Sequence, residues 1–235
     1  MAESFPRQNT YQKTMSSSEI YHALKEDILK LKLRPGQMIS ENEIAAFYCV
    51  SRTPVKIAFV RLESEGFIEV IPQKGSYITL IDAKHIRDII YMRYVLEMDM
   101  CKVAQNSPDF AHLLDALEKN LEEQKKIIQD PSLSPYTFYE VDSRFHHLLF
   151  AHSGHEQIWS VIQANQVFYT RFRLLDTTVT SRYGQLVGEH EAILAALKNQ
   201  DIDALDQGVH QHLHKNLSLL EKTAGRHRDY FVKYE

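Results

Sequence analysis

The sequence predicts a mainly helical protein in which an N-terminal winged helix-turn-helix precedes an all-helical bundle of about six helices. Apolar residues recur at helical spacing along most of the chain, and an extended-chain pattern interrupts them only over 67–80. Helix start signals then return at intervals beyond residue 80. We therefore divide the chain into a flexible tail over 1–15, a winged helix-turn-helix domain over 16–80, a helical domain over 81–223 and a C-terminal tail over 224–235.

The N-terminal domain begins with three expected helices. Helical spacing starts at Ser18 and stops at Arg34-Pro35-Gly36. The segment Ser40-Glu41-Asn42-Glu43 has the S-x-x-E form of a capping box, in which the serine caps a backbone N–H and the glutamate reaches back. This signal predicts a short helix over 41–48, and a third helix is expected over 52–65. Two strands follow, at 67–71 and 76–80, around a turn that contains Pro72 and Gly75.

Six helices are expected beyond residue 80. Residues suited to cap a helix N-terminus, among them Asp82, Ser134 and Asp201, mark their starts, and Gly154 interrupts the pattern. The expected ranges are 82–105, 108–129, 135–151, 154–176, 179–199 and 202–222.

Charge and hydropathy narrow the class of protein. No stretch approaches the roughly 18 uninterrupted apolar residues that span a bilayer, and the first fifteen residues lack the apolar run of a signal peptide, so we expect a cytoplasmic protein without membrane contact. The net charge is -4, but residues 1–80 carry ten Lys and Arg against nine Asp and Glu. The acidity therefore belongs to the second half, and the N-terminal domain remains free to contact DNA.

The third expected helix carries the residue types that read DNA. A helix-turn-helix places the start of its second helix in the major groove. Arg52 has the fork geometry to bond guanine O6 and N7, and Thr53 and Lys56 fall on the same outward side. In the hairpin, Lys74 and the bare backbone at Gly75 can approach the minor groove or flanking phosphates. Composition alone leaves a second interpretation, a solvated basic helix followed by an ordinary turn.

Five runs in this order resemble the GntR family of bacterial transcription regulators: Leu33–Gly36, Ser40-Glu41 with Ile44-Ala45, Val50–Val55, Arg61–Glu63 with Glu65-Gly66, and Gly75–Ile78. The resemblance covers residues 16–80 and implies that Arg52, Thr53 and Lys56 make the recognition-helix contacts and Gly75 the wing contact. The family usually has arginine where this chain has Lys56. A point charge replaces a planar fork there, so a phosphate contact is expected.

Polar residues occupy positions on the core faces of the expected helices in the second half. Asp142 and His146 lie four residues apart on one apolar face, and apolar neighbours place His190 and His212 inward on two other helices. A lone buried histidine is commonly a hydrogen-bonded core residue. Three imidazoles and a carboxylate instead suit a divalent transition ion, with zinc foremost and nickel, manganese or iron as alternatives. Such a set can leave coordination positions open for water or a small anion.

The same positions resemble the FCD effector domain of the FadR subfamily of GntR regulators. The matching runs are Asp142–His146, Glu189-His190 with Ile193 and Ala196-Leu197, and His212-Leu213. This resemblance implies that the four residues bind a metal, that a small organic acid completes the coordination sphere, and that the protein is a homodimer. The mixed α/β effector domain of the same family is disfavoured because its strands are missing.

A carboxylate effector also needs a cation besides the metal. Arg93 lies in an inward stripe of the helix over 82–105, so it should meet either Glu97 inside the bundle or a ligand. Asn165 aligns with apolar residues of the helix over 154–176, and Asn216 lies one turn beyond His212 on the same inward face. We expect these three residues, Arg93, Asn165 and Asn216, to bind the effector, while an Arg93–Glu97 pair remains the alternative for the arginine.

We interpret the sequence as a transcription regulator rather than an enzyme. It is expected to bind a two-fold DNA operator as a repressor, and to release it when a small organic acid binds at the metal. A regulator with a purely structural metal and no effector stays open. So does a metal-dependent hydrolase, because three nitrogens and one oxygen around a metal also describe hydrolytic centres. Against the hydrolase, no further inward Asp or Glu is placed as a general base.

Overall fold

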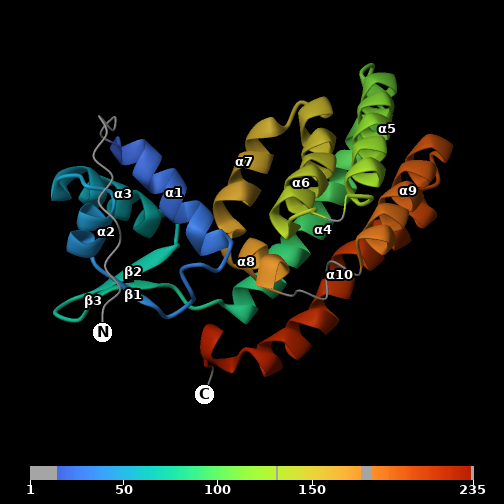
Figure 1. Ribbon diagram of the computed structural model, residues 1–235. Helices are drawn as coiled ribbons and strands as arrows, with labels where there is room; N and C mark the ends of the chain where they lie inside the picture. The colour runs from blue at the N-terminus through green and yellow to red at the C-terminus, as the bar shows by residue number, and fades with distance from the viewer. Residues whose placement is uncertain (1–14, 131, 176–181, 234–235) are drawn as a thin grey trace.

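The computed structural model describes residues 15–130, 132–175 and 182–233 of the chain. It shows an N-terminal head of helices and a small sheet, joined to a larger helical domain (Figure 1). Each of the two parts is built around its own cluster of buried apolar side chains. The predicted fold class is confirmed. The expected flexible tail over 1–15 lies outside the described residues apart from Met15.

The head contains three helices and an antiparallel sheet, with bounds α1 Ser17–Leu29, α2 Glu41–Phe47, α3 Arg52–Ser64, β1 Met38–Ile39, β2 Ile68–Ile71 and β3 Gly75–Ile78. The strand order is β1-β3-β2, with Ile68 opposite Ile78. Apolar side chains at helical spacing on α1 and α3 fill the core beneath this sheet. α3 packs against β2, and the hairpin of β2 and β3 forms the wing of a winged helix-turn-helix.

Two local features of the head differ from the expectation. The sequence does not predict β1, because a strand of two residues has no alternation to recognise. At α2 the Ser40 side chain makes no capping hydrogen bond. The reciprocal capping bonds instead join Ser16 and Glu19 at the start of α1, with Ser16 N donating to Glu19 Oε2 at 2.7 Å and Glu19 N to Ser16 Oγ at 3.2 Å.

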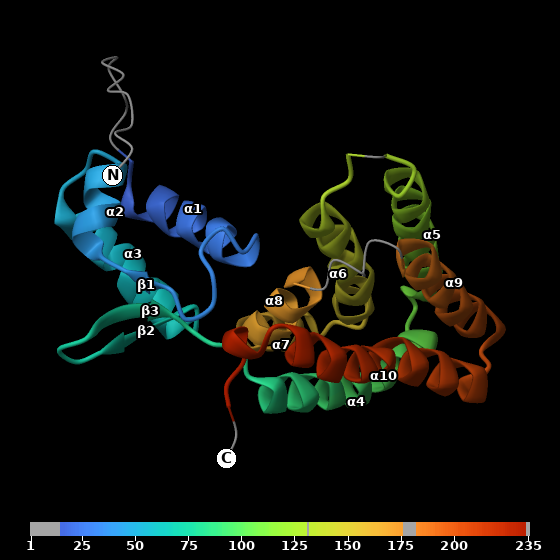
Figure 2. The same ribbon diagram turned by 60° about the horizontal axis from the view of Figure 1, so that its bottom comes forward.

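The helical domain is formed by helices α4 Ala83–Gln105, α5 Phe110–Ile127, α6 Pro135–His152, α7 Glu156–Asn165, α8 Val167–Leu175, α9 Tyr183–Asn199 and α10 Ile202–Arg226. α4 and α10 lie side by side along one face, and α5, α6 and α9 pack beyond them (Figure 2). Asp82, Ser134 and Asp201 accept backbone N–H bonds at the starts of α4, α6 and α10, as predicted. Within the described residues, no helix has the length and apolar character to cross a bilayer.

The helix expected over 154–176 is two helices, α7 and α8. They meet at Gln166, whose backbone leaves helical geometry at φ -98° and ψ 17°. The apolar pattern continues across this residue and gives no sign of the break, so the prediction of one helix is wrong. Residues before and after Gln166 consequently do not share one face. The helix expected over 179–199 begins at Tyr183, and 179–181 lie outside the described residues.

Part of the segment expected as a C-terminal tail, as far as Val232, contacts the rest of the protein. α10 continues to Arg226, and a short 3₁₀ helix, Arg228–Tyr230, follows. Ile81 N donates to Tyr230 O at 2.8 Å and Val232 N donates to Ile81 O at 3.0 Å. Phe231 is buried between them. The apolar side chain thus anchors the end of the chain at the junction of head and helical domain.

Candidate functional site

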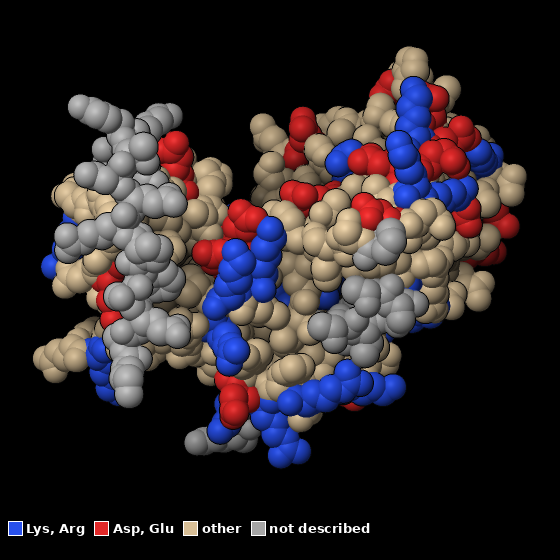
Figure 3. Space-filling view, viewed as in Figure 1, with Lys and Arg blue, Asp and Glu red and all other residues tan. Residues whose placement is uncertain are grey.

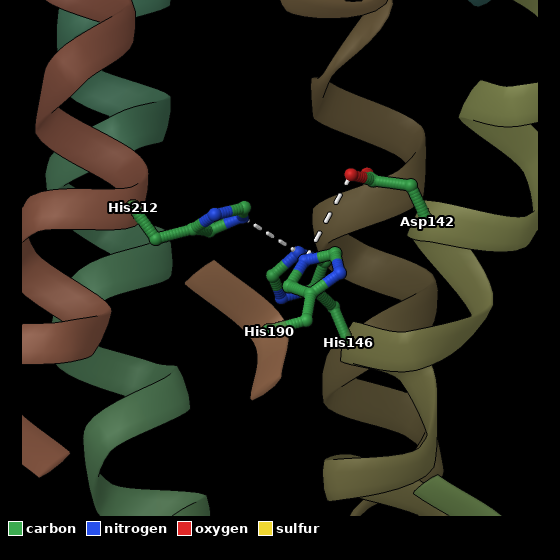
Figure 4. Close-up of side chains that lie close together, drawn as sticks. All are labelled: Asp142, His146, His190 and His212. Atoms are coloured by element: carbon green, nitrogen blue, oxygen red, sulfur yellow. Dashed lines mark hydrogen bonds and ion pairs between the residues drawn. The ribbon is translucent and has the colours of Figure 1, made fainter. Parts of the chain in front are cut away.

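Four polar side chains meet in the core of the helical domain. Asp142 and His146 lie one turn apart on α6, His190 lies on α9, and His212 lies on α10 (Figure 4). Each is at most 3% exposed. One ligand atom from each lies within 4.8 Å of the ligand atoms of the other three. The structure therefore brings together all four predicted metal ligands, which we call the tetrad.

Each imidazole of the tetrad is held by a second side chain. The Nδ1 atoms of the three rings face oxygen acceptors: His146 lies 2.8 Å from Glu97 Oε2, His190 lies 2.9 Å from Gln124 Oε1, and His212 lies 3.0 Å from Glu189 Oε2. An acceptor at Nδ1 favours the proton there and leaves the lone pair on Nε2. The Nε2 atoms are therefore the ones available to a metal ion, and the bonds at Nδ1 fix the ring orientations.

The carboxylate of the tetrad is paired with an arginine from α8. Arg173 Nη1 donates to Asp142 Oδ2 at 2.6 Å, and Arg173 Nη2 donates to Oδ1 at 3.1 Å. Both side chains are buried. Asp142 Oδ1 also lies 3.9 Å from His190 Nε2, on the side of the histidines. Arg173 therefore binds the Asp142 carboxylate from one side, and the Oδ1 atom of that carboxylate also faces the imidazoles.

The protonation states of Asp142, His146 and His190 suit a metal ion. Burial lowers the pKa of His146 and, together with the nearby His212 ring, lowers that of His190 further. Burial alone would raise the pKa of Asp142, but the Arg173 guanidinium holds it well below its usual range. Neutral imidazoles and an ionised carboxylate are the forms that bind divalent cations.

The geometry also fits such an ion. His190 Nε2 is buried and has no hydrogen-bond partner, which is unusual for a polar atom in a core. The Nε2 atoms of His146 and His212 lie 3.2 Å apart. Metal–nitrogen bonds of about 2.0–2.1 Å in a tetrahedral site place two ligand nitrogens about 3.3–3.4 Å apart, so this pair already has the spacing that an ion requires. With four protein ligands, a six-coordinate ion keeps positions for other donors.

Arg93 lies beside the tetrad on the inward face of α4. Its Nε donates to Glu97 Oε1 at 2.7 Å, and the other oxygen of Glu97 holds His146. Its Nη2 is buried without a hydrogen-bond partner. The guanidinium carbon lies 5.9 Å from the Trp159 ring centroid and 5.5 Å from that of Tyr169. The structure thus contains the Arg93–Glu97 pair and, in addition, a donor that is free to bind a ligand.

The two predicted asparagines differ in position. Asn216 is buried on α10, where its Nδ2 donates to Tyr169 Oη at 3.1 Å. Asn165 is exposed at the end of α7 and donates to Val161 O at 2.8 Å. The break at Gln166 is the reason, because the inward face predicted for one long helix does not continue across it. Asn165 therefore does not join the tetrad, and the expectation that it binds the effector there is corrected.

Helix α8 connects the tetrad with the head. Two residues before Arg173, Arg171 donates from Nη1 to Thr79 Oγ1 at 2.9 Å and from Nη2 to Thr79 O at 2.8 Å, just after β3. Arg171 is completely buried, its Nε has no hydrogen-bond partner, and burial lowers its pKa to about 10. Val167, at the start of α8, packs in the core of the head. One short helix therefore contacts both the head and the tetrad residue Asp142.

The predicted DNA-contacting residues all lie on the surface of the head. Arg52, Thr53 and Lys56 are exposed at the start of α3, Lys74 is exposed in the turn between β2 and β3, and Gly75 is exposed at the first position of β3. Arg52 Nε donates to Glu41 Oε2 of α2 at 2.6 Å. Gly75 has φ 127°, a conformation that other residues adopt only with strain. The side chains of α3 and the wing are thus accessible, and Glu41 orients the arginine.

The surface of the helical domain carries charges of both signs. On the face shown in Figure 3, blue and red side chains intermingle over the end formed by α5 and α9. Several of them pair there: Lys125 with Glu122 and Glu191, and Lys198 with Glu118. The visible part of this end therefore forms no uniform basic field.

Four residues that contact the site or its neighbours are not predicted as site residues by the sequence: the buried Gln124, Arg171 and Arg173, and the half-buried Glu189. The two arginines stand inside the apolar segment Val167–Leu175, and this was the available signal. Buried arginine requires a partner, but the sequence does not say which one. Gln124 and Glu189, which accept hydrogen bonds from histidines, have no comparable signal in the sequence. Polar residues next to an apolar helix face commonly reach solvent instead.

Comparison with protein families matches both halves of the chain. Residues 16–78 match the model described as bacterial regulatory proteins, gntR family, and residues 88–215 match that of the FCD domain. The chain is 30% identical over 217 residues to the HTH-type transcriptional repressor RspR of Escherichia coli, covering 92% of this chain and 93% of that protein. It is 27% identical to the gluconate operon transcriptional repressor of Bacillus subtilis, covering 85% and 83% of the two chains.

Solved structures share the fold. E. coli McbR/YncC aligns with a TM-score of 0.65 at 19% identity, covering 88% of this chain and 97% of that one. A putative GntR regulator from Rhodococcus sp. RHA1 aligns with a TM-score of 0.65 at 20% identity, again covering 88% and 97%. At these identities the likeness concerns the arrangement of the head and helical domain.

Proposed function

The chain belongs to the gntR family of bacterial regulatory proteins and carries an FCD domain, and we propose that it is a metal-containing repressor whose operator affinity falls when a small organic acid binds. As a family member it is a DNA-binding transcription regulator, so the metal-dependent hydrolase is set aside. Two relatives are named repressors, which supports repression as its mode. We further propose that it acts as a homodimer on a two-fold operator.

The DNA-binding part of the proposal rests on the exposed start of α3 and on the wing. Arg52 reads a guanine, with Thr53 beside it, and Lys56 contacts phosphate. Lys74 and Gly75 approach the flanking backbone or minor groove. Two such heads in a dimer would match two operator half-sites one helical turn or a multiple apart.

The effector part rests on one observation: the tetrad lies beside a buried arginine donor without a partner. Asp142, His146, His190 and His212 would hold a divalent ion, zinc foremost, which offers a positive centre to an anion. Arg93 Nη2 would hold the anion's carboxylate, and Asn216 would fix Tyr169 beside it. The domain boundaries near residues 16, 80 and 223 remain part of this proposal.

We expect His190→Ala to lose the metal and to lower the melting temperature, because metal binding returns free energy to the folded state and the substitution removes one of four ligands. The measurement is metal content per chain after reconstitution with zinc, with a melting curve of each sample. His155→Ala, which changes an exposed histidine on the same domain, is the control and should keep the ion. A full equivalent of zinc retained by His190→Ala would place the site elsewhere.

The proposed signal path runs through α8. Arg173 is hydrogen-bonded to Asp142, and Arg171 is hydrogen-bonded to Thr79, just after β3. A movement of α8 on acid binding would therefore be transmitted to the head. Coupling between two such sites is typically about 1–3 kcal/mol, or about 5- to 150-fold in affinity. A regulator with a purely structural metal predicts no change in operator affinity with any acid.

We therefore expect Arg171→Met to keep the metal and to bind acid normally, but to lose most of the acid response of operator binding. The substitution removes both hydrogen bonds to Thr79 while preserving apolar volume. Operator affinity is measured with and without each short carboxylic acid that raises the melting temperature of the zinc-loaded protein. Arg144→Met, at an exposed ion pair with Glu123, is the matched control. An unchanged response in Arg171→Met would exclude this path.

A further inference from the structure

The charged side chains around the tetrad are already paired with one another. Three ion pairs surround the four ligands: Arg173 with Asp142 at 2.6 Å, Arg93 with Glu97 at 2.7 Å, and Lys215 with Glu189 at 2.7 Å. Each pair contains one positive and one negative group, so the set has no net charge before a metal enters. The first two pairs are almost completely excluded from solvent.

Arg173 changes the charge that a metal would leave in this site. If only the four ligands are counted, the carboxylate of Asp142 offsets one of the two positive charges of a divalent ion. One positive charge then remains on the site. The bidentate contact from Arg173 has already offset that carboxylate, at 2.6 and 3.1 Å. A divalent ion therefore leaves two uncompensated positive charges in the core, and a buried uncompensated charge is strongly unfavourable.

Two guanidinium groups can donate a hydrogen bond to an anion that balances these positive charges. Arg93 Nη2 has no hydrogen-bond partner. Arg173 Nη2 makes the longer of its two bonds to Asp142 Oδ1, the oxygen directed at His190. When Oδ1 serves the metal, the short Nη1–Oδ2 bond can persist and Nη2 becomes available to another acceptor. Both arginines lie near the Tyr169 ring, whose centroid is 5.5 Å from the Arg93 guanidinium carbon and 5.8 Å from that of Arg173.

We infer that the acid bound at the tetrad is a dianion, a short dicarboxylate, and that Arg173 is the residue that sets this preference. The inference rests on the proposed function, since it concerns the same metal and effector site. One carboxylate coordinates the metal beside Arg93, and the second meets Arg173 Nη2. A monocarboxylate of equal length leaves one of the two positive charges unpaired and binds more weakly.

The test compares acids of equal carbon number on the zinc-loaded full-length protein by calorimetry, with succinate against butyrate and malonate against propionate. We expect each dicarboxylate to bind at least about tenfold more tightly than its partner, as for one added charge-assisted contact. Arg173→Gln removes the charge and should reduce this ratio below about threefold. Arg173→Lys keeps the charge and should retain a clear preference. Zinc content is measured for each variant.

Each outcome has a defined meaning. Equal binding of succinate and butyrate by the wild-type protein overturns the inference while leaving an acid effector in place. If Arg173→Gln retains zinc and still prefers dicarboxylates as strongly as the wild type, another residue binds the second carboxylate. That result also overturns the inference. If the zinc-loaded protein binds none of the four acids, the effector part of the proposed function fails, and the dianion inference fails with it.

Discussion

Replacing Arg52 by alanine is expected to lower operator affinity by about 5- to 150-fold for each half-site, because a bidentate arginine–guanine contact contributes about 1–3 kcal/mol of discrimination. The side chain is 66% exposed and contributes little to the core of the head, so the fold should remain intact. A dimer loses the contact twice. In the free protein Glu41 holds Arg52, and this pair keeps the guanidinium directed outward from α3.

The measurement is affinity for the operator and for random DNA at several salt concentrations. Arg52→Ala should lose the operator preference, whereas the comparison variant Lys56→Ala should weaken both kinds of DNA binding and flatten the salt dependence by about one unit per lost phosphate contact. If Arg52→Ala keeps the wild-type ratio between operator and random DNA, base reading belongs to other residues. Thr53 and the wing would then be the next to test.

The sequence predicts the fold well where one long apolar pattern determines an element. The three helices of the head and most of the helices beyond residue 80 have such patterns and appear near the expected places. It fails where tertiary contacts decide. The break at Gln166 interrupts a helical apolar pattern without a glycine or proline, and β1 has only two residues. Phe231 pairs with Ile81, which lies 150 residues earlier in the chain.

The site shows the same division. Asp142 and His146 share a face because they are four residues apart, and apolar neighbours place His190 and His212 inward, so all four can be found without a structure. The identity of the group that faces Asp142 cannot be found this way. Arg173 is 31 residues distant on another helix, and its partner depends on how α6 and α8 cross.

Removing Asp142 should therefore cost more stability than an ordinary core polar substitution. Asp142→Ala leaves the Arg173 guanidinium buried without an anion, and breaking a buried ion pair in this way typically costs about 3–5 kcal/mol. The double substitution Asp142→Ala with Arg173→Met replaces both charges by apolar groups and should recover most of that loss. Unfolding midpoints in urea, measured with a chelator present, give the free energies of the single and double variants.

The control for this cycle is the exposed pair of Arg144 and Glu123, which joins the neighbouring helices α6 and α5. Its double-mutant cycle should give about 0–1 kcal/mol, since solvent screens exposed ions. A coupling of the same small size for Asp142 and Arg173 would mean that solvent reaches the guanidinium. Arg173 would then not offset the charge of the Asp142 carboxylate inside the core. A divalent ion would leave one uncompensated positive charge at the site instead of two, and the reason to favour a dicarboxylate would be lost. The stability cycle therefore tests, without any ligand, the electrostatic premise of acid selection.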